Sequence, residues 1–217
     1  DSLTTATPRA QELLSGPMVG HTTTDSARIW VEADRPVEVK VRYWLEPRVQ
    51  YSRSLGEPIV LGVAEGRTTD SPPYTGTVEL KDLRPGWLVY YEIELDDRPI
   101  RPATPQVFSL FPSYDESDTD PEFTVALASC AFPARVPEQP IWRQISRHRP
   151  TALLLIGDNN YMPNHPGAYE TSEEVVAYAM ARYHRYFRDL SGLRALLATT
   201  PSVSYTHLRA HETKANL

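Results

Sequence analysis

Apolar and polar residues alternate along much of the first half of the chain. Residues 37–44 read VEVKVRYW and residues 89–95 read VYYEIEL. Because successive side chains of a strand point to opposite faces, this pattern predicts strands with one buried and one solvent-exposed face. Further short strands are predicted at residues 27–33, 58–63, 75–80 and 106–111.

Turns containing proline and glycine separate these predicted strands, for example at Pro72–Pro73. About seven short strands within about 95 residues are typical of a β-sandwich of the immunoglobulin or fibronectin type. The chain has one cysteine, so no intrachain disulfide can join two sheets, which favours a fibronectin type III-like sandwich. We expect an N-terminal segment at residues 1–15, the sandwich at 16–111 and an acidic linker at 112–121.

The pattern changes in the second half. Residues 123–130 (FTVALASC) and 151–157 (TALLLIG) are nearly continuous apolar segments, with a helical pattern at 137–149 between them. A strand, a helix and a second strand without alternation predict a parallel sheet that is buried on both faces.

Two more helices are expected downstream, at residues 171–190 and 191–199. The longer one carries an apolar stripe at helical spacing. Arg182, Arg185 and Arg188 lie late in this helix, where the helix dipole favours cations. We interpret this arginine row as a solvated helix face.

Net charge limits the class of partner. The formal net charge of -6 argues against nucleic acid as a stable partner, because phosphate backbones are bound by an excess of Lys and Arg. A phosphate ester substrate would need a cation to offset the protein's own charge. No apolar run approaches the ~20 residues of a membrane span.

Polar residues follow both apolar strands of the second half. Cys130 ends the first strand, and Asp158, Asn159, Asn160 and Tyr161 follow the second. Ligands of open parallel sheets bind beyond the carboxyl ends of the strands, so neighbouring strands would bring a thiol, a carboxyl and a phenol together. Phenolate prefers a strongly Lewis-acidic ion such as ferric iron, and one carboxylate can bridge two ions ~3.5–4 Å apart.

Each of these residues also has a structural interpretation. A single cysteine is often a small buried hydrophobe, Gly-Asp after a strand is often a turn, and a tyrosine often packs in a core. His165 and His184 could be further ligands, although both also fit plain surface histidines.

Two motifs resemble a known family. LASC at residues 127–130, followed after one crossover by LLLIGDNNY at 153–161, resembles the PhoD-like (alkaline phosphatase D) metallophosphoesterases of the calcineurin-like superfamily. Residues 16–33 and 83–95 resemble the fibronectin-like domain that precedes the catalytic domain in this family. Residues 181–202 resemble the stretch that leads to its third metal-binding segment.

The resemblance implies an exported phosphomonoesterase or phosphodiesterase that uses iron with calcium, although no signal peptide is visible in this chain. Cys130 and Tyr161 would bind the iron, and Asp158 would bridge the metals. Asn159 matches no ligand of the family, and neither does the asparagine after it. Many members carry an acidic residue just after the tyrosine, where this chain has Met162.

The C-terminal tail departs from the family pattern. The family would continue into a strand ending in a Trp-Asp-Asp-His-like segment, whereas residues 203–217 (VSYTHLRAHETKANL) show no strand pattern and resemble a translated sequencing adapter. We therefore expect residues 122–202 to be the N-terminal part of a metallophosphoesterase domain, and the chain to be an inactive fragment. His207 and His211 in this tail have the i, i+4 spacing of a helical metal-binding pair.

Two other functions are consistent with the sequence. The β-sandwich could be a non-catalytic binding module for a surface or glycan, with the rest of the chain as scaffold. Cys130 could also be the nucleophile of a thiol enzyme, but this needs a nearby general base and the sequence shows no obvious histidine partner.

Overall fold

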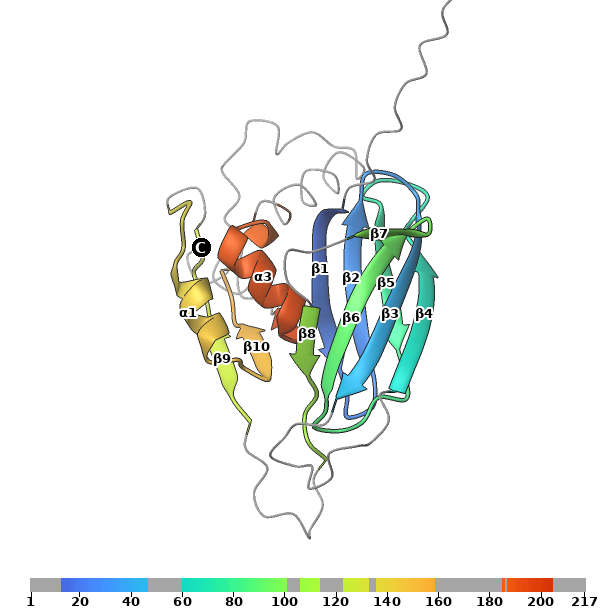
Figure 1. Ribbon diagram of the computed structural model, residues 1–217. Coiled ribbons are helices and arrows are strands. Elements are labelled where there is room, and N and C mark those ends of the chain that lie inside the picture. The colour runs from blue at the N-terminus through green and yellow to red at the C-terminus, as the bar shows by residue number, and fades with distance from the viewer. Residues whose placement is uncertain are drawn as a thin grey trace, which may run out of the picture.

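The computed structural model describes residues 13–46, 60–100, 106–113, 123–132, 136–158, 185 and 187–204. Figure 1 shows two parts side by side, a β-sandwich and a smaller part that contains both helices and strands.

Two antiparallel sheets form the sandwich. One sheet has the order β1 (Leu13–Thr22), β2 (Ala27–Ala33), β5 (Thr75–Leu80). The other has the order β4 (Val60–Arg67), β3 (Glu38–Glu46), β6 (Leu88–Leu95). Strands β7 (Arg98–Ile100) and β8 (Gln106–Ser109) both pair with β6.

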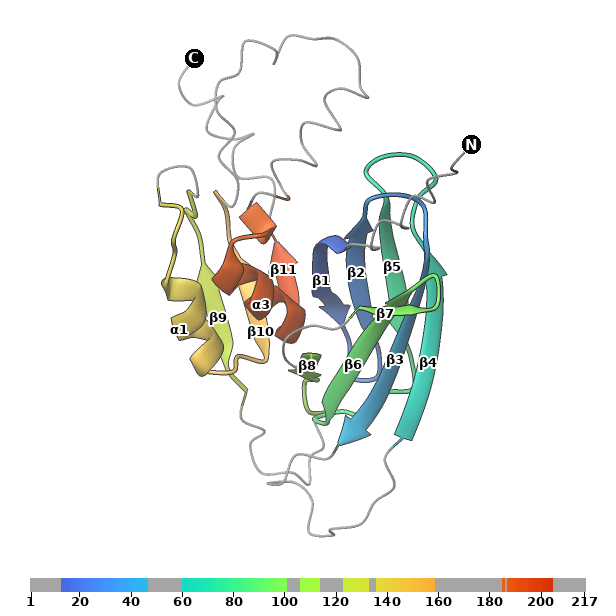
Figure 2. The same cartoon turned by 45° about the horizontal axis from the view of Figure 1, so that its top comes forward.

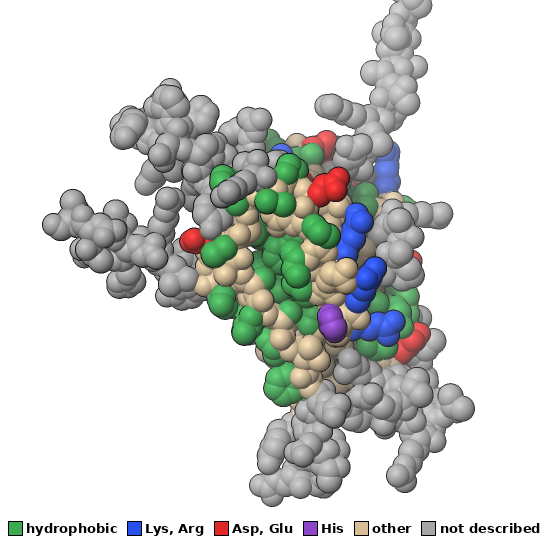
Figure 3. All heavy atoms as spheres, turned by 90° about the vertical axis from the view of Figure 1, so that its left-hand side faces the viewer, with side chains coloured by type: hydrophobic (Ala, Val, Ile, Leu, Met, Phe, Trp, Pro, Cys, Tyr) green, Lys and Arg blue, Asp and Glu red, His purple; other side chains and the backbone are tan. Residues whose placement is uncertain are grey.

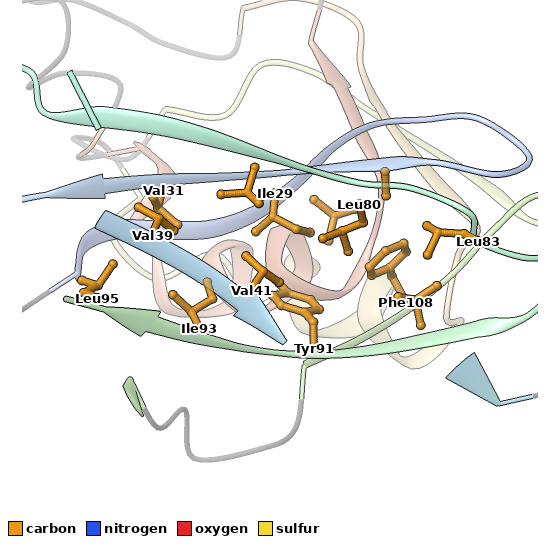
Figure 4. Close-up of a cluster of buried hydrophobic side chains, with 14 of the residues drawn as sticks. Ile29, Val31, Val39, Val41, Leu80, Leu83, Tyr91, Ile93, Leu95 and Phe108 are labelled. Atoms are coloured by element: carbon orange, nitrogen blue, oxygen red, sulfur yellow. The ribbon is translucent and has the colours of Figure 1, made fainter. Parts of the chain in front are cut away.

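The alternating residues of these strands make the sandwich core. Val39 and Val41 of β3 face Ile29 and Val31 of β2 across the interior, and all four are buried (Figure 4). Burying one such side chain contributes roughly 1.5–3 kcal/mol relative to leaving it exposed. The predicted period-two strands with one buried face are therefore confirmed.

The second part is a parallel sheet with two helices. Along the chain its elements are β9 (Val125–Ala128), α1 (Ile141–Arg147), β10 (Ala152–Leu155), α3 (Ser191–Thr199) and β11 (Ser202–Ser204). The strand order is β11-β10-β9, and both pairings are parallel. Right-handed crossovers in one direction along a sheet place both helices on the same face, as Figure 2 shows.

That arrangement corrects the expectation of a sheet buried on both faces. Leu153 and Leu155 pack against the helices, but Leu127 and Val203 are 63% and 57% exposed on the opposite face. Leu154 lies in register between these two. Helices on a single face shield only one set of alternate residues. Among the described residues, the apolar residues of β9 and β11 on the other face stay open to solvent.

The expected absence of a strand pattern after Ser202 is wrong for two residues. Val203 and Ser204 belong to β11, and they lie in register with Leu154 and Leu155 of β10. Three residues are too few to show a period in sequence. Their strand conformation follows from hydrogen bonding to an existing neighbour.

Helix α1 is shorter than the predicted 137–149. It begins at Ile141, after Pro140, whose missing N–H is tolerated at a helix start. Trp142 is buried as expected, whereas Ile141 is 56% exposed and does not join the packed side. Helix α3 matches the predicted 191–199. Most of the helix predicted at 171–190 lies outside the described residues.

The two parts are in direct contact. Helix α3 lies against β1 and β8, the strands at which the two sandwich sheets end on one side (Figure 1). The Tyr91 hydroxyl, inside the sandwich, donates to the Ala198 carbonyl over 2.7 Å. Arg185 and Arg188 form ion pairs with the buried Glu32 of β2. Their interpretation as a solvated face was therefore wrong, because the sandwich covers them.

Candidate functional site

The carboxyl ends of β9 and β10 lie next to each other. The Ile156 N–H donates to the Ala128 carbonyl over 2.9 Å, and the Cys130 N–H donates to the Gly157 carbonyl over 3.3 Å. This parallel pairing confirms that the two apolar strands are neighbours. Cys130 is therefore bonded through its backbone to the residue that precedes Asp158.

Three residues at this edge have a left-handed backbone. The φ angles are 58° at Cys130, 139° at Gly157 and 46° at Asp158. Glycine adopts such angles freely, whereas other residues do so uncommonly and at a cost of roughly 1–3 kcal/mol. Such strain persists where surrounding structure maintains it, and it clusters at functional sites. At both strand ends the backbone therefore leaves the extended strand conformation, at Cys130 after β9 and at Gly157 and Asp158 after β10.

Both candidate side chains are accessible. Cys130 and Asp158 are exposed. A hollow of about 910 Å³ lies beside Cys130, and apolar residues such as Phe132, Val136 and Trp142 form most of its lining. Figure 3 shows the side of the molecule that carries β9 and α1, where hydrophobic side chains gather in the middle of the face. The few polar lining groups include Ser129 and Cys130 itself.

Sequence reasoning did not predict this hollow. It forms between the end of β9 and the start of α1, and so depends on how the connecting loop returns across the sheet. The sequence feature that indicates this hollow is the presence of two apolar residues, Phe132 and Val136, in that loop. Both are exposed in the structure. Gln139 also lines the hollow and accepts a hydrogen bond from the Trp142 indole over 2.7 Å.

Two of the three predicted metal ligands fall within the described residues. Cys130 and Asp158 share one edge of the sheet, while Tyr161 lies outside the described residues. The other polar candidates also lie outside them: Asn159, Asn160, His165, His184, His207 and His211. In the part of the chain that the structure describes, no three His, Cys, Asp or Glu residues lie close enough together to hold a metal ion.

The donors that are present fit a metal ion in kind. A thiolate is a soft ligand and a carboxylate a hard one, and both are common in protein metal sites. Two donors on adjacent strand ends make part of a coordination shell. The described residues are therefore compatible with a metal centre that needs further ligands.

Comparison with protein families gives one match. Residues 10–113 match a family described as "Domain of unknown function (DUF7800)", which corresponds to the region of the sandwich. A search of curated proteins found no match. Among the described residues, no helix is long and apolar enough to cross a membrane.

Two solved structures resemble this chain over most of its length. One is PhoD, with a TM-score of 0.65 and 18% identity over 93% of this chain and 40% of that chain. The other is a purple acid phosphatase isolated from yellow lupin (Lupinus luteus) seeds, with a TM-score of 0.54 and 13% identity over 88% of this chain and 34% of that one. This chain thus spans well under half of either protein. At such identities the likeness establishes a shared fold, which confirms the resemblance to PhoD at the level of fold.

Proposed function

We propose that this chain is the N-terminal part of a metal-dependent phosphoesterase of the PhoD type. The observation that carries the proposal is the position of Cys130 and Asp158 at the ends of adjacent strands, both in left-handed backbone, with Cys130 hydrogen-bonded to Gly157. The similarity of fold to PhoD and to an acid phosphatase supports it. The substrate would be a phosphate monoester or diester, and the protein would be exported.

Cys130, Asp158 and Tyr161 would hold the metal, with iron and calcium as the ions that the family resemblance implies. When bound, metal ions would polarise a phosphoryl oxygen and lower the pKa of water. They would also offset the protein's formal net charge of -6, which repels a phosphate ester. The chain's own part is to fix the ligands: the parallel β9–β10 pairing sets the spacing, and Gly157 permits the turn that brings Asp158 to the edge.

We further propose that the remaining ligands belong to a part of such proteins that has no counterpart here. PhoD is the more similar of the two structures, and this chain covers 40% of it. The proposed organisation is a sandwich at residues 16–111, a linker at 112–121, a partial catalytic domain at 122–202 and a tail at 203–217. The first two residues of that tail, Val203 and Ser204, continue the sheet as part of β11.

Metal binding by this chain tests the proposal. The purified protein is titrated with ferric iron, and bound iron is measured by elemental analysis and by the visible absorption that an iron–tyrosinate bond produces. We expect the wild-type chain to bind iron weakly. The affinity for iron should fall at least tenfold in Cys130→Ser and in Asp158→Asn. Metal should also slow alkylation of Cys130.

The matched control is Asp82→Asn, because Asp82 is an exposed aspartate with a φ of 57° in a turn of the sandwich. Iron binding should be unchanged in that variant. An equal loss of iron binding in Asp82→Asn and Asp158→Asn would contradict the proposed metal site. So would alkylation of Cys130 at the same rate with and without iron.

A further inference from the structure

We propose that the sandwich and the α/β part form one cooperative folding unit, coupled through the buried carboxylate of Glu32. The two parts would then not be a separable binding module and its scaffold. The proposal concerns folding, and it does not depend on the proposed phosphoesterase activity.

Glu32 occupies an unusual position for a glutamate. Along β2, Ile29 and Val31 face the sandwich core, so Glu32 and Trp30 alternate onto the outer face of the sheet. Outer faces of sandwiches are normally solvated, yet Glu32 is 1% exposed. The α/β part supplies the cover that removes this carboxylate from water.

Two arginines of the α/β part compensate the buried charge. Arg185 donates from Nε to Oε1 of Glu32 over 3.0 Å and makes a second, closer contact with the same oxygen. Arg188 donates to Oε2 over 3.1 Å. Each carboxylate oxygen therefore has its own guanidinium partner. Both arginines come from one helical segment, three residues apart, so the pairing requires that segment to be folded.

Arg188 binds the sandwich at two more points. Its guanidinium lies 4.4 Å from the centre of the Trp30 ring, and its Nε donates to the Ser15 hydroxyl over 3.3 Å. Burial lowers the pKa of Arg188, and the attraction of Glu32 opposes that shift. The Ser15 hydroxyl also donates to Asp189 over 3.1 Å. This interface therefore contains charges of both signs, and their burial is tolerated only while they remain paired.

Contacts continue along the chain beyond this cluster. Arg194 donates to the Gly16 carbonyl over 3.0 Å, and the Ser202 hydroxyl donates to the Val19 carbonyl over 3.1 Å. With the Tyr91–Ala198 bond, contacts with the sandwich extend from Arg185 to Ser202. This segment forms α3 and leads into β11, which pairs with β10. The sandwich therefore orients the sheet that carries Asp158.

Urea unfolding, followed by hydrogen exchange and mass spectrometry, tests this coupling. Peptides from β3 report on the sandwich, and peptides from β10 report on the α/β part. In the wild-type chain both should lose protection at one urea concentration. In Glu32→Gln, the β10 transition should move to lower urea and separate from the β3 transition, because the two arginines lose their counter-charge.

Glu79→Gln is the matched control, since Glu79 forms an exposed ion pair with Arg28 at 3.5 Å within the sandwich. The two transitions should stay together in that variant. Arg188→Lys keeps the positive charge but loses the forked geometry of the guanidinium, so it should separate the β3 and β10 transitions less than Glu32→Gln does. If Glu32→Gln does not fold, Arg188→Lys is the variant that tests the coupling. The proposal would be overturned if β3 and β10 unfolded at different urea concentrations in the wild-type chain. It would also be overturned if both Glu32→Gln and Arg188→Lys left the two transitions together and at the wild-type urea concentration.

Discussion

At the residue scale, Gly62 shows how an absent side chain shapes the sandwich. The ring of Tyr43 on β3 lies across Gly62 of β4, and a Cβ at that position would overlap the ring. The Tyr43 hydroxyl is anchored by donating to the Lys81 carbonyl over 3.2 Å, so the ring cannot move away without losing that bond. An aromatic ring that covers a strand glycine compensates for the weak packing of glycine in a strand.

Gly62→Ala should therefore destabilise the protein by about 1–3 kcal/mol, the usual cost of overpacking. The free energy of unfolding in urea is the measurement. Gly20→Ala on β1 is the control, because a Cβ there would meet the Arg28 carbonyl at an ordinary 3.5 Å. That change should lie within about 1 kcal/mol of zero, since a less flexible unfolded chain offsets small strain. An equal loss in both variants would contradict the explanation.

At the element scale, the three-stranded parallel sheet is apolar on a face that the described residues leave open. Val125, Leu127 and Val203 are 38%, 63% and 57% exposed there. Parallel strands normally bury both faces, and exposed apolar patches promote association. Among the described residues, β9 and β11 are the outer strands of this sheet, and the outer strand of a sheet can pair with another chain.

The purified chain should consequently self-associate as its concentration rises, and Leu127→Lys should shift it markedly toward monomer. Sedimentation velocity at several concentrations measures this. Val63→Lys is the matched control, because Val63 is 54% exposed on β4 of the sandwich, away from the parallel sheet. A monomeric wild-type chain, or equal suppression by both substitutions, would show that the open face of the parallel sheet does not drive association.

At the scale of the whole molecule, the arrangement of the two parts bears on function. Buried ion pairs and a hydrogen bond from the Tyr91 side chain to a backbone carbonyl join them, so the sandwich is packed against the α/β part. The proposed metal site lies on the α/β part and includes two described donors. Catalysis by such a site needs a complete coordination shell.

The isolated chain should therefore show no metal-dependent hydrolysis of p-nitrophenyl phosphate above the buffer rate. The assay is run with iron and calcium together, at protein concentrations where binding is saturated. The Asp158→Asn variant provides the baseline. Turnover that depends on metal and disappears in that variant would show that this chain carries a complete site, and would contradict its proposed role as a fragment.

The sequence by itself determined the local elements. The strands predicted at 27–33 and 75–80 and the helix predicted at 191–199 have the same bounds in the structure. These signals are local, because burial of one face of a strand or helix imposes its period on adjacent residues. The strand–helix–strand order likewise predicted that β9 and β10 are parallel neighbours, which places Cys130 beside Gly157 and Asp158.

Only the tertiary structure decided what covers each surface. Glu32 and Arg185 are 153 positions apart in sequence, so no local pattern could show that the buried carboxylate of one would pair with the guanidinium of the other. β11 likewise exists through its pairing with β10, and the open face of that sheet follows from both helices lying on one side. The position of a residue in the repeating apolar pattern indicates which face of its strand or helix it occupies. Whether that face meets water or another element depends on contacts between distant parts of the chain.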